Sequence, residues 1–390
     1  MSILKKLAVA TFVSCMTYGN YPAHAADRTI VISADYTADV MQVVGRQVDD
    51  SAYWLDNLNV TADADLDRLA GWRGGAFHVH LLNNLGGMPN DAAGTLQGID
   101  NIEVPKQRLR LFEAWLQQGI GESTTVRAGL YDLNSEFYAN DAAGTLTAPA
   151  FGVGSEISAT GPNGPSIFPS TALAVRIEHR FGGDSGGVLR LAAMNAHANT
   201  LGDPGGIDFK FHDGLLLIGE GGIEGDIELT VGAWAYTRRQ DDIYAVDSDG
   251  RPLRRKAHGA YVIFEHSLNG QDGPGAAKAF FRVGVSDGRT TPFRGGWQAG
   301  ITITQPIASR PDGVLSMGAN QGYLSKGYRA AQRDDGIDTR RAETAFELTY
   351  ADMLFGRLGV QPVVQLVMNP AGEKRRDPVG VFGMRFSIDL

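Results

Sequence analysis

The stretch that decides the fold is VFGMRFSIDL, residues 381–390, in which apolar side chains alternate with small or polar ones. A repeat of two residues is the signature of a β-strand, whose successive side chains point to opposite faces. One face is fully apolar and consists of Phe382, Met384, Phe386, Ile388 and Leu390. The other face consists of Gly383, Arg385, Ser387 and Asp389. An apolar row backed by a polar row predicts a strand that lies between lipid and water.

The same alternation recurs along the whole chain. It predicts about sixteen strands, at residues 29–42, 53–69, 75–84, 107–119, 123–132, 171–181, 187–197, 213–223, 226–238, 256–269, 276–287, 294–306, 313–324, 341–352, 358–369 and 377–390. Short connections alternate with longer ones, and the longer ones include 85–106, 133–170, 198–212, 239–255 and 325–340. Short periplasmic turns and longer external loops are typical of outer-membrane barrels. The sequence therefore predicts an all-β, transmembrane, antiparallel barrel of about 16 strands.

The first residues indicate export. Lys5 and Lys6 precede a short apolar run at 7–16, and Ala23-His24-Ala25 resembles a cleavage signal. We expect residues 1–25 to be a secretory signal peptide and residues 26–390 to form the barrel domain in the cell outer membrane.

Composition excludes several other classes of protein. The single cysteine, Cys15, lies in the signal segment, so thiol catalysis and structural disulfides are excluded. The net charge of −9 falls to −11 when the two signal lysines are removed, which argues against nucleic acid as a partner. The zinc-hydrolase motif H-E-x-x-H is absent. The stretch GDSGG at 183–187 has the letters of G-x-S-x-G, but it joins two predicted strands and so does not predict the strand-to-helix elbow of a serine hydrolase. We expect no enzymatic activity and no cofactor or metal.

Several ordered blocks resemble the OprB-type carbohydrate-selective porins from about residue 50 onward. They are LNVTADADLDRLAGW (58–72), FHVHLLNNLGG (77–87), QGIDNIE (97–103), RLFEAWLQQ (110–118), RAGLYDLNSEF (127–137), GPNGPSIFPSTALA (161–174), DGLLLIGEG (213–221), RAETAFELTY (341–350), QPVVQLVMNP (361–370) and 381–390. The resemblance implies a sixteen-stranded porin for passive uptake of monosaccharides and small oligosaccharides. The loops at 198–212 and 239–255 match no pattern of that family. A porin of the same architecture for organic acids or amino acids is the alternative function.

Charged and aromatic side chains recur on the predicted inner face. We expect the channel-lining and substrate-contacting residues to be Arg127, Arg176, Glu178, Arg180, Arg190, Glu220, Trp234, Arg238, Glu265, Arg282, Glu347 and Arg385. The charged members would hydrogen-bond sugar hydroxyls and set a transverse field, and Trp234 would stack on sugar rings. The competing interpretation is that these residues are solvated or form ion pairs within the wall.

The connection at 133–170 is long enough to demand an explanation. We hypothesise that it folds inward and narrows the pore, with Asp132, Asn134, Glu136 and Phe168 at the constriction. An ordinary external loop is the alternative.

Two histidines, His78 and His80, share one inward face of a predicted strand. No third metal ligand is evident at a useful spacing, so we interpret them as lumen histidines rather than as a metal site.

The architecture also predicts partners. We expect small sugars as permeants, outer-membrane lipid and lipopolysaccharide around the barrel, and the barrel assembly machinery acting through the C-terminal strand. A homotrimer is a further possibility.

Overall fold

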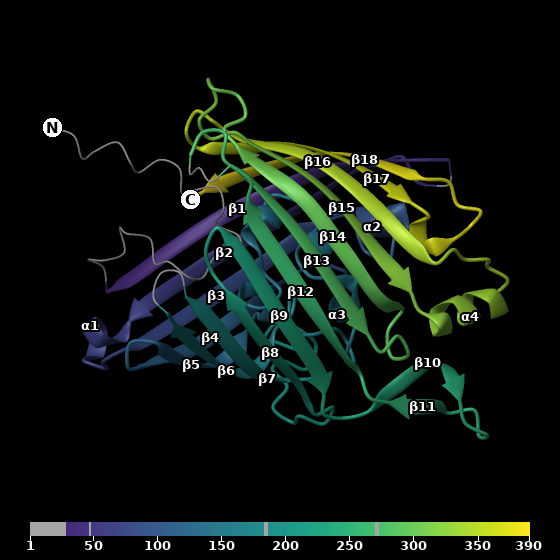
Figure 1. Cartoon of the computed structure of the whole chain (residues 1–390), viewed down its shortest axis with the longest axis horizontal. Coiled ribbons are helices and arrows are strands. Elements are labelled where there is room, and N and C mark those ends of the chain that lie inside the picture. The colour runs from purple at the N-terminus through teal and green to yellow at the C-terminus, as the bar shows by residue number, and fades with distance from the viewer. Residues whose placement is uncertain (1–28, 47, 183–185, 270–272) are drawn as a thin grey trace.

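Sixteen strands within the described residues pair edge to edge into a closed antiparallel barrel (Figure 1). The computed structural model describes residues 29–46, 48–182, 186–269 and 273–390, so the predicted signal peptide at 1–25 lies outside the described residues. The barrel strands are β1 (Ile30–Val44), β2 (Ala52–Asp65), β3 (Gly75–Gly86), β4 (Arg108–Ile120), β5 (Thr124–Tyr131), β6 (Ala172–Phe181), β7 (Gly187–Asn195), β8 (Leu215–Ile223), β9 (Ile227–Tyr236), β12 (His258–Ser267), β13 (Ala277–Ser286), β14 (Phe293–Thr304), β15 (Val314–Leu324), β16 (Ala342–Leu354), β17 (Leu358–Met368) and β18 (Val379–Asp389).

The barrel closes where its first and last strands meet. Strand β1 pairs with β18 in a register that runs from Asp35 opposite Asp389 to Val44 opposite Gly380. An even number of antiparallel strands makes this closure possible, because the first and last strands must run in opposite directions. Closure leaves no unpaired strand edge, which a bilayer would not tolerate.

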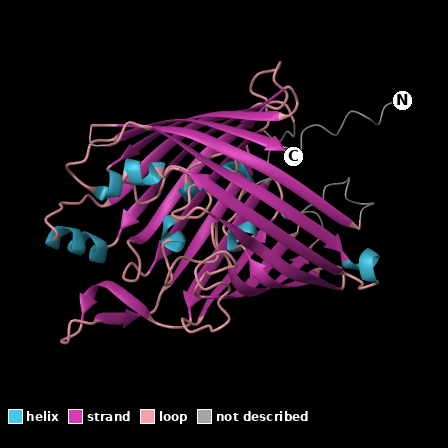
Figure 2. Cartoon of the chain, turned by 180° about the vertical axis from the view of Figure 1, so that it is seen from behind, coloured by secondary structure: helices cyan, strands magenta, loops and turns pink. Residues whose placement is uncertain are grey.

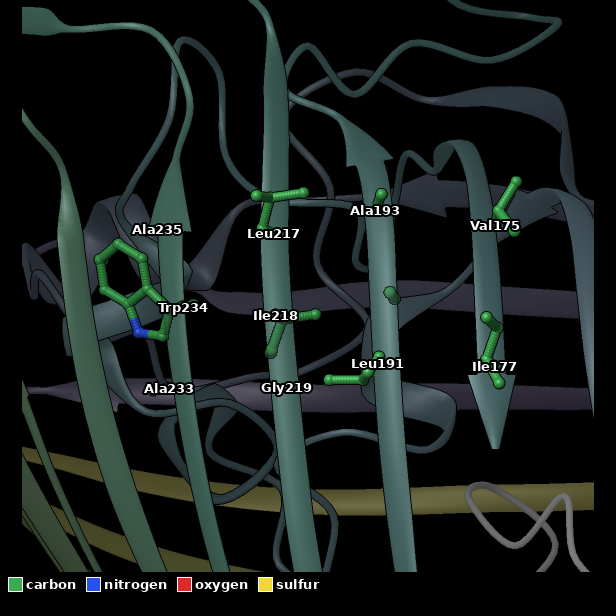
Figure 3. A pocket seen from close by; sticks show the side chains of 11 residues that line it. Val175, Ile177, Leu191, Ala193, Leu217, Ile218, Gly219, Ala233, Trp234 and Ala235 are labelled. Carbon is green, nitrogen blue, oxygen red and sulfur yellow. The ribbon is translucent and has the colours of Figure 1, made fainter. Parts of the chain in front are cut away.

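The two faces of the wall differ as the alternation predicts. On β18, Phe382, Phe386 and Ile388 are exposed on the outer face, whereas Val379 and Val381 are fully buried inside. A shallow apolar groove crosses the outside of β6, β7, β8 and β9 (Figure 3). Leu191 and Leu217 line it together with small residues such as Gly219 and Ala233. Because these side chains belong to the lipid-facing rows, the groove is not part of the pore.

One predicted strand end is wrong. The segment predicted at 53–69 leaves the sheet at Asp65, and α1 (Leu66–Ala70) follows. The carboxylate of Asp65 accepts hydrogen bonds from the backbone N–H groups of Asp67 and Arg68, and Gly71 ends the helix in the left-handed region. A side-chain cap at one end and a glycine at the other favour a helical turn over continued pairing.

The remaining elements lie in the connections. Strands β10 (Gln240–Val246) and β11 (Pro252–Arg255) form a separate hairpin. The helices are α2 (Pro89–Ala93), α3 (Ser155–Ser158) and α4 (Lys326–Asp334), with 3-10 turns η2 (Leu133–Ser135), η3 (Asp141–Ala143), η4 (Pro149–Phe151) and η6 (Pro370–Gly372). Among the residues that the structure describes, no helix has the length and apolarity to cross a membrane.

Candidate functional site: the barrel interior

Two connections enter the barrel and pack against its inner wall. Residues 132–171, between β5 and β6, are here called the inward loop, and residues 87–107, between β3 and β4, the second inward segment. Figure 2 shows short helices and loops within the ring of strands. The interior is therefore filled on one side by the chain itself.

An apolar core seats the first part of the inward loop. Leu133, Phe137 and Ile157 are fully buried in one cluster with the wall residues Trp234 and Tyr236. Burial of these large side chains stabilises the loop by roughly 1.5–3 kcal/mol each. Trp234, predicted to stack on sugars, instead lies beneath the loop with 3% of its surface exposed.

Three predicted lumen carboxylates bind the backbone of the inward loop. Glu220 accepts a hydrogen bond from the N–H of Tyr138 at 2.9 Å. Glu265 accepts one from the N–H of Ala142 at 2.9 Å. Glu347 accepts two, from the N–H groups of Thr147 and Ala148. Buried backbone N–H groups need partners, and in a loop without a sheet ladder the wall carboxylates supply them.

Glu347 holds the middle of the loop with both carboxylate oxygens. Its Oε1 accepts from the N–H of Thr147 at 2.6 Å, and its Oε2 accepts from the N–H of Ala148 at 2.9 Å. The side chain of Gln361 donates to the carbonyl of Thr145 at 2.6 Å. Strands β16 and β17 therefore hold residues 145–148 through both backbone N–H and backbone carbonyl groups.

Arg282 on β13 performs the complementary role for loop carbonyls. Its guanidinium donates to the carbonyls of Tyr138, Ala150, Phe151 and Gly152 at 2.5–3.2 Å. The Arg282 side chain is 1% exposed, so it cannot reach a passing solute in this structure. Arg282 therefore fixes residue 138 and residues 150–152 of the inward loop to the wall at β13.

Glu136 of the inward loop lies between two wall arginines. It forms an ion pair with Arg176 and a second one with Arg127 at 3.4 Å, and Tyr131 donates its hydroxyl to the same carboxylate. Burial raises the pKa of Glu136, but the two guanidinium charges outweigh burial and leave this pKa below its ordinary value. The Arg127 guanidinium also lies 3.8 Å from the ring centroid of Trp115. Glu136 thus carries a charge that is fully neutralised by the wall.

The start of the loop is held by β4. Glu113 accepts a hydrogen bond from the N–H of Asp132 at 3.0 Å, and the Asp132 carboxylate accepts from the N–H of Asn134 at 3.0 Å. Burial, followed by the Glu113 charge, raises the pKa of Asp132 well above its ordinary value. The side chain of Asn134 donates to the carbonyl of Phe137 at 3.2 Å. Phe168 packs edge-on to Phe112; with it, all four residues predicted at the constriction belong to the inward loop.

Three further predicted arginines, Arg180, Arg190 and Arg238, lie in different environments. Arg190 bridges Glu178 at 2.7 Å and Glu220 at 3.2 Å. Arg180 also pairs with Glu178, at 3.0 Å, but its side chain is 47% exposed. Arg238 is not on the wall, because β9 ends at Tyr236 and Arg238 lies in the exposed turn that follows. Its predicted inward position is therefore not what the structure shows.

The second inward segment is bound by wall residues for which no role was expected from the sequence. Glu343 accepts hydrogen bonds from the N–H groups of Leu96 and Gln97, both at 2.9 Å. Gln365 donates to the carbonyl of Ile99 at 2.8 Å. The parity of β16 could have identified Glu343, because it lies four residues before Glu347 on the same strand face.

One side of the interior keeps solvent-accessible polar side chains. The inner faces of β1, β2, β3 and β18 carry polar residues that keep part of their surface accessible, namely Asp35, Thr37, Thr61, Asp63, His80, Arg385 and Ser387. Of these, Arg385 also hydrogen-bonds Asn101 of the second inward segment. The opposite wall is covered: Glu220, Glu265 and Glu347 are at most 4% exposed. We call the partly accessible set the open polar face. It combines hydrogen-bond donors and acceptors of both signs along one line of the barrel.

The described residues also contain one group of possible metal ligands. His78, His80 and Glu113 each offer one atom, and these atoms lie within 4.8 Å of one another. The sequence alone did not reveal Glu113 as the third member.

Comparisons with known proteins agree with this architecture. Residues 49–390 match the family described as "Carbohydrate-selective porin, OprB family". The high-pH structure of Pseudomonas putida OprB is similar with a TM-score of 0.81 and 18% identity, covering 94% of this chain and 96% of that one. The low-pH structure of the same protein gives a TM-score of 0.57 and 14% identity, with 94% of each chain covered. The outer-membrane channel DcaP of Acinetobacter baumannii gives 0.54 and 9%, covering 93% and 97%.

At these identities the structural likeness shows the fold alone. No curated protein matches the chain in sequence at a significant level.

Proposed function

Because this chain belongs to the OprB family of carbohydrate-selective porins, we propose that monosaccharides and small oligosaccharides diffuse through it along the open polar face. The family and the closed barrel make the protein a carbohydrate porin, a channel rather than an enzyme. They also imply an outer-membrane location. Solutes would move down their own gradients, without a cofactor or an energy source.

The observation that carries the proposed path is the asymmetry of the interior. The inward loop and the second inward segment cover the wall from β4 to β17 and also the inner faces of 41–43 on β1 and 379–381 on β18. They leave accessible the part of the inner wall that carries Asp35, Thr61 and Ser387. A solute that crosses the barrel therefore meets Asp35, Thr61 and Arg385 rather than the buried glutamates. Carboxylate, hydroxyl and guanidinium groups suit sugar hydroxyls, which both donate and accept hydrogen bonds.

The inward loop would set the bore. Its anchors are short hydrogen bonds to the wall carboxylates Glu220, Glu265 and Glu347 and from Arg282, so the loop would act as a fixed constriction and not as a mobile lid. Deletion of residues 140–160 tests this. We expect single-channel conductance in a planar membrane to rise, and an unchanged conductance would refute the constriction.

Liposome swelling tests the substrate class. Glucose should enter faster than a disaccharide, and both should outpace an organic acid of similar size, because the open polar face holds Asp35 and Asp63. If the organic acid or a neutral amino acid permeates best, the alternative function is correct. Reversal potentials measured with salts of organic acids would make the same distinction.

Matched variants test the path itself. Asp35→Asn and Thr61→Val change the open polar face without touching the anchors of the loop, and we expect each to lower the swelling rate for glucose severalfold. Arg238→Ala, on the exposed turn after β9, is the control and should leave the rate unchanged. Equal rates in all four proteins would mean that sugars take another path.

Export and assembly complete the proposal. Residues 1–25 would be removed as a signal peptide, lipid and lipopolysaccharide would surround the apolar rows, and the barrel assembly machinery would act on β18. Mass spectrometry of the protein from outer membranes would give the first residue of the mature chain. Light scattering or native mass spectrometry in detergent would distinguish a monomer from a homotrimer.

A further inference from the structure

The inner wall contains a compact group of two imidazoles and one carboxylate. His78 and His80 lie two residues apart on the inner face of β3, and Glu113 lies opposite His80 on β4. The register shifts directly after His80, since Leu81 pairs with Leu111 and Phe112 is the extra residue. Bulges of this kind re-aim neighbouring side chains and are common beside functional sites. Here the bulge lies next to Glu113.

The three side chains converge on one point. The Oε2 atom of Glu113 is 3.8 Å from Nε2 of His78 and 3.9 Å from Nδ1 of His80. Both His78 and Glu113 are at most 2% exposed, and His80 is 13% exposed. The group therefore lies below the surface of the lumen, with His80 at its accessible edge.

Hydrogen bonds behind the imidazoles decide which ring nitrogens face Glu113 as acceptors. Nδ1 of His78 lies 2.7 Å from the Asp63 carboxylate, and a carboxylate accepts, so this nitrogen carries a proton. In the neutral ring, the electron pair is then on Nε2, the atom that faces Glu113.

A longer chain of hydrogen bonds orients His80 in the same way. The side-chain amide of Asn59 donates to the Asp35 carboxylate at 2.8 Å, which leaves the Asn59 oxygen to accept from Nε2 of His80 at 2.9 Å. The electron pair of the neutral His80 ring is then on Nδ1. Among the described residues, this buried nitrogen has no hydrogen-bond partner.

We propose that His78, His80 and Glu113 bind one divalent first-row transition ion of the Zn²⁺ type through Nε2, Nδ1 and Oε2. Two imidazole nitrogens and a carboxylate oxygen form a ligand set that zinc takes with a further position left for water. Bonds of about 2.0–2.2 Å at a tetrahedral angle place two ligands roughly 3.4 Å apart. The two carboxylate–imidazole separations of 3.8 and 3.9 Å need a closure of about half an ångström for such an ion. The widest separation in the group, at most 4.8 Å, needs roughly 1.4 Å, which a rotation of the partly exposed His80 side chain would supply.

The partners behind the ligands support a metal rather than a chance cluster. Imidazoles that bind zinc donate their second nitrogen to a carboxylate or a carbonyl oxygen, which fixes the ring and raises its basicity. Asp63 does this for His78, and Asn59 does it for His80. The other oxygen of Glu113 is occupied by the N–H of Asp132. The ion would therefore join β3 to β4 at the residue that anchors the start of the inward loop.

Titration of the folded, untagged protein in detergent tests the site. After treatment with a chelator, Zn²⁺ is added in a calorimeter and Co²⁺ is followed by its visible d–d absorption. We expect one equivalent of each ion to bind, and the thermal unfolding temperature to rise with the Zn²⁺ concentration because the ion binds the native state.

Variants locate the ion. His80→Gln and Glu113→Gln should each weaken Zn²⁺ binding by far more than tenfold, and Asp63→Asn should weaken it roughly 10- to 100-fold while the stoichiometry stays at one. His179→Gln, which changes an exposed histidine on β6, is the control and should bind as the wild type does.

Two results would overturn the proposal. One is wild-type protein that takes up less than one equivalent of either ion. The other is wild-type affinity in the folded His80→Gln protein, whose side chain lies at the accessible edge of the group and can be replaced without a buried cavity. Either result would assign the cluster to histidines that share protons with Glu113 instead.

Discussion

The guanidinium of Arg385 on β18 grips the carboxylate of Asp39 on β1 through two parallel contacts, at 2.9 and 2.7 Å, across the seam where the barrel closes. Asp39 is fully buried and opposite Arg385 in the strand register. Arg385 also donates to the side chain of Asn101 at 2.7 Å, so it ties the second inward segment to the same seam. One residue of the C-terminal strand thus joins barrel closure to the lining of the pore.

Removal of the arginine should weaken the closed barrel. Arg385→Met leaves the buried Asp39 carboxylate without its partner, and we expect the free energy of unfolding to fall by about 3–5 kcal/mol. Unfolding in urea from detergent micelles measures the loss. Arg46→Ala is the control, because Arg46 pairs only loosely with Asp377 and both are largely exposed. An equal loss of unfolding free energy in both variants would show that the Arg385–Asp39 pair stabilises the barrel no more than an exposed ion pair does.

Release of the inward loop should open the pore. Glu347→Ala removes the acceptor for the N–H groups of Thr147 and Ala148, which costs about 1–3 kcal/mol for each buried group left unpaired. We expect a larger and noisier single-channel conductance and faster proteolysis within residues 140–160. Glu122→Ala, on an exposed turn, serves as the control. A Glu347→Ala channel with wild-type conductance but altered sugar preference would instead support the original expectation of substrate contact.

A glycine of the wall makes room for a carboxylate of the loop. At Gly284 on β13, a Cβ atom would overlap the side chain of Glu156, whose other neighbour is the hydroxyl of Tyr138 at 2.6 Å. Gly284→Ala should therefore displace α3, destabilise the protein by about 1–3 kcal/mol and raise conductance. Gly221→Ala on β8 is the matched control, because its Cβ would meet only ordinary contacts. Unchanged conductance and stability in Gly284→Ala would show that the loop has slack at this position.

The charge of the second inward segment should depend on pH. Burial raises the pKa of Glu103 from an ordinary 4.5 to about 7. The group is neutral below this pKa and negative above it, so a negative charge appears in the segment as the pH rises through about 7. We expect cation selectivity, read from reversal potentials in a salt gradient, to increase between pH 6 and 8. The increase should follow the titration curve of a single group with a pKa of about 7.

Glu103→Gln supplies the control for that titration. The variant should keep the low-pH selectivity of the wild type at every pH in the window. A pH dependence that persists in Glu103→Gln would assign the effect to another group.

The strand pattern was predictable because it depends on neighbours in sequence. The two-residue repeat places the side chains of Phe382, Met384 and Phe386 on one face of the strand. A continuous apolar face opposite a polar one is stable in a wall between lipid and water, so this face was predicted to point outward. The strand ends were predicted to within a few residues, with the helix after Asp65 as the clear error. The side-chain cap formed by Asp65 sets that boundary, and a pattern of alternating polarity contains no information about helix caps.

The inner residues were harder to interpret. Parity placed Glu220, Glu347 and Arg282 on the inner face, but it could not tell a solvated charge from one that binds a loop. There was also no reason in the sequence to single out Glu343 and Gln365. Nothing local shows that Glu343 will accept an N–H group from a residue 246 positions away, or that Gln365 will donate to the carbonyl of Ile99.

The sequence by itself determined the barrel, the alternation of inner and outer faces along its strands and, through its ordered blocks, the resemblance to carbohydrate-selective porins. Only the tertiary structure decided which charges remain open to solutes, because that depends on where the inward loop lies. It also placed Glu113 beside His78 and His80. Alternation is a local consequence of strand geometry, whereas the partner of a buried N–H or an imidazole is set by contacts that form only when the barrel has closed.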